Sequence, residues 1–234
     1  MSTYLSGMES EWPRRTPIGT PIEAVKAMRI LTIISVTVGL ALFAAESIAQ
    51  DVDHGADEYK LCASCHGFKG EGNQLVNAPA LASQEDWYLD RQIRNFRDGV
   101  RGSSVDDTHG HTMALMSQGL ESDEQIADVV AYIGNLPAPV SQGTVGGDST
   151  RGQGLYSTCA ACHGTEAKGT PALNAPSLVT TSDWYQVRQL ELFKQGLRGA
   201  HADDTYGQQM RPMANILVDG AAIRDVVSYI NSLK

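Results

Sequence analysis

The sequence predicts an all-α protein, a tandem duplication of one small helical domain. Sliding the 234-residue chain against itself by 97 residues aligns positions 59–136 with 156–233 without a gap, and 34 of these 78 positions are identical. A repeat of this length corresponds to a whole domain, because the units of solenoid proteins have periods of roughly 20 to 50 residues. Within each copy, apolar residues recur at helical spacing and the connections are long.

Three helices are expected in each copy. The first is short and leads into a pair of cysteines, with Tyr59 and Tyr156 one turn before the first cysteine of each pair. The second begins near Asp86 and stops at Gly99, a residue type that favours the C-cap position. Its counterpart in the second copy is expected to stop at Gly196.

The third helix begins with a capping box, in which Ser122 is followed three residues later by Gln125. Apolar residues then line one helical face in both copies: Ile126, Val129, Val130 and Ile133, and Ile223, Val226, Val227 and Ile230. We interpret these as core residues, which position a bound group without doing chemistry. Each copy is therefore predicted to be a small helical bundle.

The domain boundaries follow from the repeat and from composition. The copies are expected at residues 51–136 and 148–234, and the proline- and glycine-rich segment 137–147 between them is predicted to be a linker. Residues 1–49 are interpreted as a secretory signal peptide that is cut after Ala49. Because that segment contains four basic and four acidic residues, the mature protein keeps the formal net charge of −9.

The predicted signal peptide contains an uncharged, apolar stretch at Ile30–Ala45, preceded by Lys26 and Arg29. This stretch is shorter than the roughly 20 apolar residues of a membrane-spanning helix. Cleavage is therefore preferred, and an uncleaved membrane anchor is the alternative. The residues before Met28 lack the short basic region of a signal peptide, so an extension wrongly assigned upstream of a true start at Met28 is considered.

Composition excludes some classes of protein. With 42% hydrophobic and 19% charged residues, the chain can form packed cores and is not typical of a disordered polymer. Its acidic balance argues against nucleic acid as a partner.

All four cysteines fall in two matched motifs, each followed at once by a histidine. The motifs are Cys62-Ala63-Ser64-Cys65-His66 and Cys159-Ala160-Ala161-Cys162-His163. This C-x-x-C-H spacing is the attachment signature of a c-type haem. Two thiols one helical turn apart can each add to a haem vinyl group, and the adjoining imidazole can ligate the iron. The chain is therefore predicted to carry two covalently attached haem c groups.

A zinc site and a redox-active dithiol are the other interpretations of a C-x-x-C pair. A zinc site would require both pairs, 97 residues apart, to converge on one tetrahedral ion. A redox dithiol is typical of a βαβ setting and needs no histidine after the second cysteine. Exported thiols would ordinarily form disulfides, and haem attachment resolves that conflict.

A haem iron that is bound by the motif histidine needs a second axial ligand. The candidates are two methionines in each copy, Met113 and Met116 in the first and Met210 and Met213 in the second. A methionine ligand raises the reduction potential and closes the coordination site, which favours electron transfer over reactivity.

The chain resembles a two-domain, dihaem class I cytochrome c over nearly all of residues 51–234. The resemblance rests on the attachment motifs, the methionine segments, the Asn-Ala-Pro segments at 77–79 and 174–176, and the closing helix around 128–133. It implies that each domain wraps one low-spin haem and that the two haems lie close enough to exchange electrons. It also implies maturation on the outer side of an energy-transducing membrane, by default in the periplasm.

In that family the ligand methionine precedes the leucine that introduces the last helix, at a spacing that Met113 reproduces with Leu120. The resemblance therefore implies His66 and Met113 as iron ligands in the first domain, and His163 and Met210 in the second. The other methionine of each copy then takes the place of an apolar packing residue.

The resemblance also suggests roles for residues around the haem. A proline carbonyl of the family accepts a hydrogen bond from the proximal imidazole, a role implied for Pro79 and Pro176, with a simple turn proline as the alternative. Arg101 and Arg198 could contact haem propionates, although solvated arginines are at least equally expected.

Other conspicuous side chains receive no role in the site. His109 and His111 are absent from the second copy and are interpreted as surface or loop residues. His54 is given no role for the same reason. Trp87-Tyr88 and Trp184-Tyr185 recur in both copies and are interpreted as core packing.

The predicted function is electron transport in the periplasm, between redox proteins such as membrane respiratory complexes or a periplasmic dehydrogenase, with no substrate chemistry. A cytochrome subunit of a larger dehydrogenase or oxidase complex is the first alternative. A dihaem peroxidase is the second, and it would require an iron with an open or releasable sixth position. Partner docking is expected to be weak and transient.

Overall fold

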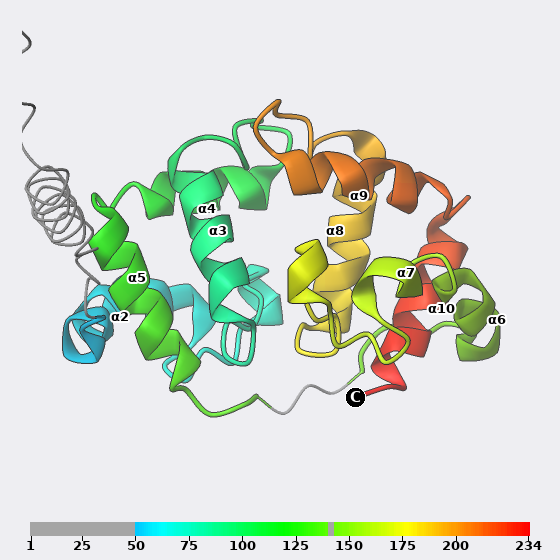
Figure 1. Cartoon of the computed structure of the whole chain (residues 1–234), viewed down its shortest axis with the longest axis horizontal. Helices are drawn as coiled ribbons and strands as arrows, with labels where there is room; N and C mark the ends of the chain where they lie inside the picture. The colour runs from blue at the N-terminus through cyan, green and yellow to red at the C-terminus, as the bar shows by residue number, and fades with distance from the viewer. Residues whose placement is uncertain (1–49, 140–142) are drawn as a thin grey trace, which may run out of the picture. The chain divides into compact units, whose positions relative to one another are not determined.

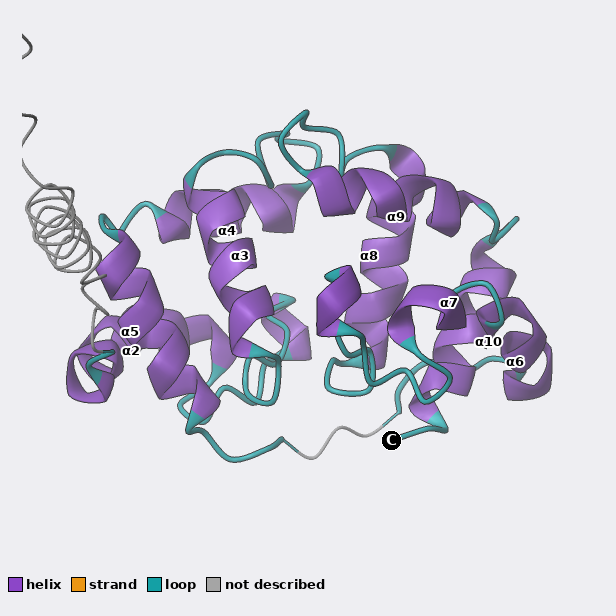
Figure 2. Cartoon of the chain, viewed as in Figure 1, coloured by secondary structure: helices purple, strands orange, loops and turns teal. Residues whose placement is uncertain are grey.

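Helices account for all the regular secondary structure in the described part of the chain (Figure 2). The computed structural model describes residues 50–139 and 143–234, so the predicted signal peptide lies outside the described residues. The helices of the first domain are α2 (Val52–His66), η1 (Gln74–Val76), α3 (Asp86–Arg97), α4 (Thr108–Ser117) and α5 (Asp123–Gly134) (Figure 1). Those of the second are α6 (Ser149–Tyr156), α7 (Ala160–His163), η2 (Pro171–Leu173), α8 (Asp183–Gln195), α9 (Thr205–Asn215) and α10 (Gly220–Asn231). None of these described helices is long and apolar enough to cross a membrane.

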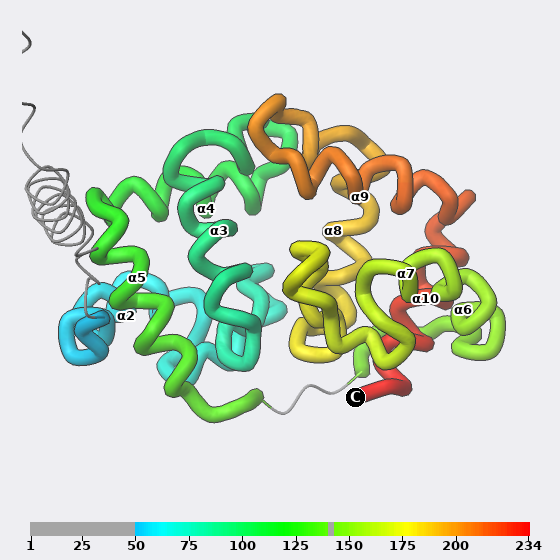
Figure 3. The backbone as a smooth tube through the Cα atoms, in the orientation of Figure 1, coloured from blue at the N-terminus to red at the C-terminus, as the bar shows by residue number. Residues whose placement is uncertain are grey.

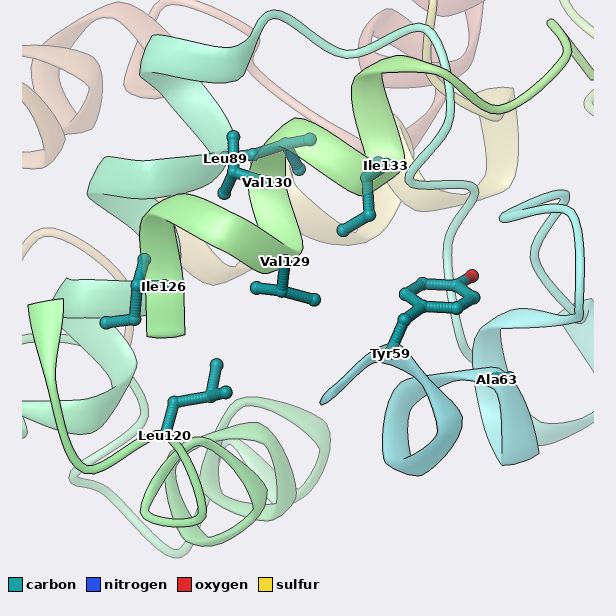
Figure 4. Packing of buried hydrophobic residues seen from close by; sticks show 8 residues of the cluster. All are labelled: Tyr59, Ala63, Leu89, Leu120, Ile126, Val129, Val130 and Ile133. Carbon is teal, nitrogen blue, oxygen red and sulfur yellow. The ribbon is translucent and has the colours of Figure 1, made fainter. Parts of the chain in front are cut away.

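The closing helix α5 forms the centre of the first domain's core, as predicted. Its capping box is confirmed, because the Ser122 hydroxyl accepts a hydrogen bond from the Gln125 amide at 3.1 Å and the Gln125 side chain accepts one from the Ser122 amide at 3.0 Å. Figure 4 shows the buried cluster around this helix: Tyr59, Ala63, Leu89, Leu120, Ile126, Val129, Val130 and Ile133. In the second domain α10 holds the same position, packed against Tyr156 and Leu217.

The N-terminal helix of each domain, α2 or α6, packs against the closing helix (Figure 3). A glycine permits the close approach in each case. A Cβ atom on Gly55 of α2 would lie 2.0 Å from the carbonyl oxygen of Asp128 in α5. A Cβ on Gly152 of α6 would lie equally close to the carbonyl oxygen of Asp225 in α10. Because only glycine permits this approach, these crossings fix the helix that leads to each cysteine motif against the core.

Two predictions about the helices need correction. The α3 helix ends at Arg97 with Asp98 at the C-cap, so Gly99 lies one residue beyond the predicted position, whereas Gly196 does cap α8 with a left-handed φ of 73°. The prediction of three helices per copy is also incomplete, because the methionine segments form two further helices, α4 and α9. The side chain of Asp107 begins α4 by accepting a hydrogen bond from a backbone amide of its first turn.

The C-terminal part of the predicted linker is attached to the second domain. The backbone amides of Thr144 and Val145 donate to the carboxylate of Asp183, the latter at 2.7 Å. Burial alone would raise the pKa of Asp183, but these hydrogen bonds outweigh burial and hold the pKa below its usual value. Asp183 therefore joins the linker to the first turn of α8 as a buried, ionised carboxylate.

Candidate functional site

The attachment residues of the first domain lie at the C-terminal end of α2. His66 is buried, Cys62 is partly buried and Cys65 is exposed, and both thiols are free. All three side chains line a cleft whose other walls come from residues 76–81 and from α3, α4 and α5. The predicted motif is thus placed at a cleft with mostly apolar walls.

The second domain presents the same three groups on a shorter helix. Cys159 is the N-cap residue of α7, and Cys162 and His163 lie within that helix. The His163 amide donates to the Cys159 carbonyl at 2.9 Å, which is the bond of one α-helical turn. The break between α6 and α7 therefore leaves the two thiols and the imidazole on a single turn, as in the first domain.

Each motif histidine is oriented by a proline carbonyl. The Nδ1 atom of His66 lies 2.7 Å from the carbonyl oxygen of Pro79, and that of His163 lies 2.8 Å from the carbonyl oxygen of Pro176. A carbonyl oxygen only accepts, so Nδ1 carries the proton and Nε2 keeps its lone pair. Burial lowers the pKa of both histidines. The predicted proline contacts are confirmed, and each imidazole is a neutral ligand with Nε2 available for iron.

The thiols do not have the properties of a redox-active dithiol. Burial raises the pKa of Cys62 to about 11 and also raises the pKa of Cys159. A redox-active dithiol needs the opposite shift, because the thiolate is the reactive species. Within the described ranges, no group of three or more His, Cys, Asp or Glu side chains is arranged to hold a metal ion, which argues against the shared zinc site.

The candidate methionines occupy two different positions on their helices. Met113 and Met116 both line the cleft of the first domain. Met113 is partly buried, whereas Met116 is 40% exposed. The second domain repeats the difference, with Met210 partly buried and Met213 39% exposed. The inner methionine of each pair is the one that the family spacing selects.

Two histidines of the first domain lie closer to the site than expected. His109 and His111 belong to helix α4 rather than to a loop, and His109 lines the cleft. His111 makes a hydrogen-bond contact through Nδ1 with the Gly102 carbonyl at 3.1 Å. The interpretation of these histidines as surface or loop residues is correct only in part: His109 is indeed exposed at the surface, but neither lies in a loop. The helix could not be predicted because the sequence of this segment has no apolar stripe.

A family model described as cytochrome c matches residues 52–137 and again residues 149–234. The chain belongs to the cytochrome c family. Its two tandem cytochrome c domains carry two haem c groups, attached at the two C-x-x-C-H motifs. The residues fit this cofactor, because each motif combines free thiols with a neutral, carbonyl-oriented imidazole.

Several named proteins are similar to this chain over more than half of its length. Cytochrome c4 of Pseudomonas aeruginosa is 27% identical over 212 residues, which cover 86% of this chain and 98% of that protein. The thiosulfate dehydrogenase electron acceptor of Thiomonas intermedia is 32% identical over 153 residues, covering 60% of this chain and 66% of that protein. The crystal structure of reduced recombinant cytochrome c4 from Pseudomonas stutzeri matches with a TM-score of 0.61 at 26% identity, over 80% of this chain and 100% of that one. The chain is thus a dihaem electron carrier of the cytochrome c4 kind.

Two arginines have surroundings that differ from those expected from the sequence. Arg101 and Arg198 are only 6% and 8% exposed, so the expectation of solvated side chains is wrong. Tyr88 and Tyr185 are not simple core residues either, since each hydroxyl accepts a hydrogen bond from the arginine of the other domain at 3.0 Å. The identical spacing from tyrosine to arginine in both copies was the available signal, but sequence cannot show that the partners are exchanged between domains.

Proposed function

We propose that the mature protein works in the periplasm as a soluble shuttle of single electrons between respiratory partners. The observation that carries this proposal is the cleft of the first domain, where a buried neutral imidazole and a partly buried methionine come from different helices. The repeat supplies the same residues to the second domain. Bound haem supplies the one-electron chemistry of its iron, and the chain supplies ligands and a low-dielectric shell that set the potential.

The iron ligands of this proposal are His66 and Met113 in the first domain, and His163 and Met210 in the second. A pyridine haemochrome assay combined with intact mass tests the attachment and counts the haems. Cys62→Ala is expected to remove haem from the first domain only. The matched variant Cys159→Ala is expected to remove it from the second only. A colourless wild-type protein, or one that contains zinc, would overturn the proposal.

The proposed mature protein comprises domains at residues 51–136 and 148–234, joined by the linker 137–147. Export would remove residues 1–49. The same intact mass locates the mature N-terminus, which is expected to follow Ala49. A mass that retains the apolar stretch would instead support a membrane anchor.

A second candidate function is the cytochrome subunit of a larger complex. The cbb3-type cytochrome c oxidase subunit FixP of Bradyrhizobium diazoefficiens is 26% identical over 182 residues, covering 74% of this chain and 57% of that protein. The thiosulfate dehydrogenase TsdBA of Marichromatium purpuratum matches with a TM-score of 0.61 and 25% identity, over 76% of this chain and 39% of that one. Stable co-purification with a catalytic subunit would favour this function over the free shuttle.

A peroxidase receives less support from the site. Such an enzyme needs an iron with an open or releasable sixth position, whereas each domain here has a methionine at the position that the family uses. Peroxide turnover by the purified dihaem protein is the measurement that would favour it.

The partner surface is proposed to be basic. Residues 51–136 contain 15 acidic and six basic side chains, and residues 148–234 contain eight of each. The whole formal charge of −9 therefore belongs to the first domain. Opposite charge accelerates encounter between redox proteins, so a basic partner would approach the first domain preferentially.

A further inference from the structure

A histidine and a carboxylate on α2 lead from the protein surface to the wall of the first haem cleft. The His54 side chain is 47% exposed, its Nδ1 atom lies 2.8 Å from a carboxylate oxygen of Asp128, and its Nε2 atom lies 3.5 Å from one of Glu58. Gln125 of α5 donates to the same oxygen of Glu58 at 2.7 Å and so holds it in place. Glu58 itself lines the cleft. Its carboxylate therefore links an exposed histidine to the wall of the haem site.

The His54 ring has one nitrogen available to take up a proton. A carboxylate oxygen only accepts, so Nδ1 carries the hydrogen that is donated to Asp128, and the lone pair of Nε2 faces Glu58 when the ring is neutral. Protonation of Nε2 replaces this repulsive contact with an ion pair. The hydrogen bond with Asp128 raises the pKa of His54 above 6.5. His54 therefore gains and loses its proton in the physiological pH range.

The charged groups that act on His54 in the described part of the chain are acidic: Asp51, Asp57, Glu58 and Asp128. The first three belong to α2 or its N-cap, and Asp128 belongs to α5, the helix packed against α2. Of these four carboxylates, Glu58 is the one that lines the cleft. Protonation of His54 therefore reaches the haem site chiefly through Glu58.

The second domain has no titratable equivalent of this pair. Arg151 takes the place of the histidine and bonds Asp225, and Leu155 takes the place of the glutamate. Leu155 packs against the hydrophobic core. Arginine stays charged at every physiological pH and leucine carries no charge. Charge at these two positions is therefore independent of pH in the second domain only.

The charge of this pair acts on the electron that a haem accepts. Reduction adds one negative charge to the haem, and charges interact more strongly in a low-dielectric cleft than in water. Protonated His54 neutralises Glu58, whereas neutral His54 leaves a carboxylate uncompensated at the cleft wall and disfavours reduction. A reduced haem in turn favours the protonated histidine, because coupling between two binding events is reciprocal.

We propose that His54 and Glu58 couple reduction of the first haem to the uptake of a proton, whereas the second haem takes up an electron alone. The electron comes from the redox partner and converts ferric to ferrous iron. The proton comes from solvent and binds Nε2 of His54, and oxidation releases both. Rising pH then lowers the first potential relative to the second and favours passage of the electron to the second haem. This inference rests on the proposed electron-shuttle function and adds a proton to it.

The test is a spectroelectrochemical titration of the dihaem protein between about pH 6 and about pH 8.5, the range in which a histidine with a raised pKa titrates. The midpoint potential of the first haem is expected to fall as the pH rises, and that of the second to stay level. Met113→Ala, which is expected to lower the first potential, assigns the two values. Nuclear magnetic resonance of the His54 ring gives the reciprocal measurement on wild type, with a higher pKa expected in the ferrous than in the ferric protein.

Two substitutions fix the two protonation states. His54→Arg keeps a positive charge at every pH, and His54→Gln has none. Each is expected to make the first potential independent of pH over this range. The potential should stay near the acid limit of wild type in the arginine variant and near the alkaline limit in the glutamine variant. Glu58→Gln is expected to raise the first potential most at alkaline pH, where wild type leaves this carboxylate unpaired.

His109 is the histidine to exclude, because it lines the same cleft. His109→Gln is therefore the matched control, and it is expected to preserve the fall of the first potential with pH. The proposal is overturned if the first potential of wild type stays level, if both His54 variants retain the fall, or if the pKa of His54 is the same in the two redox states. Failure of the proposed shuttle function looks different, since it would appear as fewer than two haems or as the absence of reversible reduction.

Discussion

At the scale of single residues, a buried tyrosine in each domain holds the chain that follows the motif histidine. The Tyr59 hydroxyl donates to the Gly67 carbonyl at 2.7 Å, and the Tyr156 hydroxyl donates to the Gly164 carbonyl at the same distance. Burial raises the pKa of both tyrosines, so both remain protonated donors. This hydrogen bond holds the residue after the histidine against a helix residue eight positions earlier in the sequence. It therefore fixes the direction in which the chain continues after the histidine.

We predict that Tyr59→Phe lowers the free energy of unfolding of the dihaem protein by about 1 kcal/mol, because a carbonyl loses its donor while the ring still packs. Urea unfolding followed by haem absorption measures the change. Tyr132→Phe is the control, since the Tyr132 ring packs on Tyr59 at a centroid distance of 5.2 Å. Equal losses in the two variants would show that the bond to Gly67 contributes nothing specific.

Different results are expected when the two methionines of the first domain's cleft are replaced. Met113→Ala is expected to abolish the weak red absorption band of sulfur-bound ferric haem in one domain, which is roughly half of its total intensity, and to lower that haem's potential. Met116→Ala is the matched control, because Met116 is more exposed, and it is expected to keep the band. The opposite outcome would exchange the two roles.

Residue-scale prediction from sequence works where covalent spacing determines the chemistry. The position of His66 directly after Cys65 predicted an iron ligand, and a contact with Pro79 followed from the family resemblance. The burial of Arg101 could not be predicted in this way. Two of its partners, Tyr185 and Gln189, lie 84 and 88 residues away in the other domain, and only the folded chain brings them together.

At the scale of elements, the first helix of each domain is joined to the closing helix by an acidic side chain. Asp128 of α5 bonds Nδ1 of His54 in α2 at 2.8 Å. The second domain replaces the histidine with Arg151, which bonds Asp225 of α10. Sequence comparison of the copies gave His54 no role, although histidine and arginine here make the same contact.

This replacement predicts that the contact weakens with rising pH in the first domain only. The hydrogen bond with Asp128 raises the pKa of His54 above 6.5, and the charges of Glu58 and Asp51 act in the same direction. The stabilisation is therefore complete below about pH 6.5 and is lost as the pH rises through the folded-state pKa. His54→Arg, which copies the second domain, is expected to remove that dependence.

Urea unfolding of wild type and His54→Arg at several pH values between about 6 and 8.5 measures the difference. Wild type is expected to lose stability relative to the variant as the pH rises. Parallel pH profiles would contradict this role of His54.

Helices with an apolar stripe were predictable, and helices without one were not. The apolar residues of α5 recur at helical spacing, and the capping residue Ser122 marks the start of the helix. In α4 the sequence reads Thr-His-Gly-His-Thr-Met-Ala-Leu-Met-Ser, with an internal glycine and no stripe, and α9 even contains Pro212. Capping by Asp107 and Asp204 together with packing on α3 and α8 stabilises these two helices. Such tertiary contacts override weak local preference.

At the scale of the whole molecule, duplication has produced two domains of the same fold but different charge. Glu121 and Glu124 flank the start of α5, next to Leu120 of the first cleft, whereas the equivalent positions in the second copy are Val218 and Ala221. Leu61 and Met116, which line the same cleft, are 48% and 40% exposed. The exposed rim of the first cleft therefore lies beside acidic side chains that are absent from the equivalent positions of the second domain.

We predict that a cationic electron donor reduces the protein faster at low than at high ionic strength, because exposed charges are screened over about 10 Å in 0.1 M salt. Stopped-flow reduction by hexaammineruthenium(II) measures this. Replacing Glu121 and Glu124 by glutamine is expected to slow the reaction several-fold at low salt and to change little at high salt. The same change of charge on the second domain, at Glu166 and Glu191, is expected to have a smaller effect. Equal effects would mean that net charge alone, rather than its concentration on the first domain, directs the encounter.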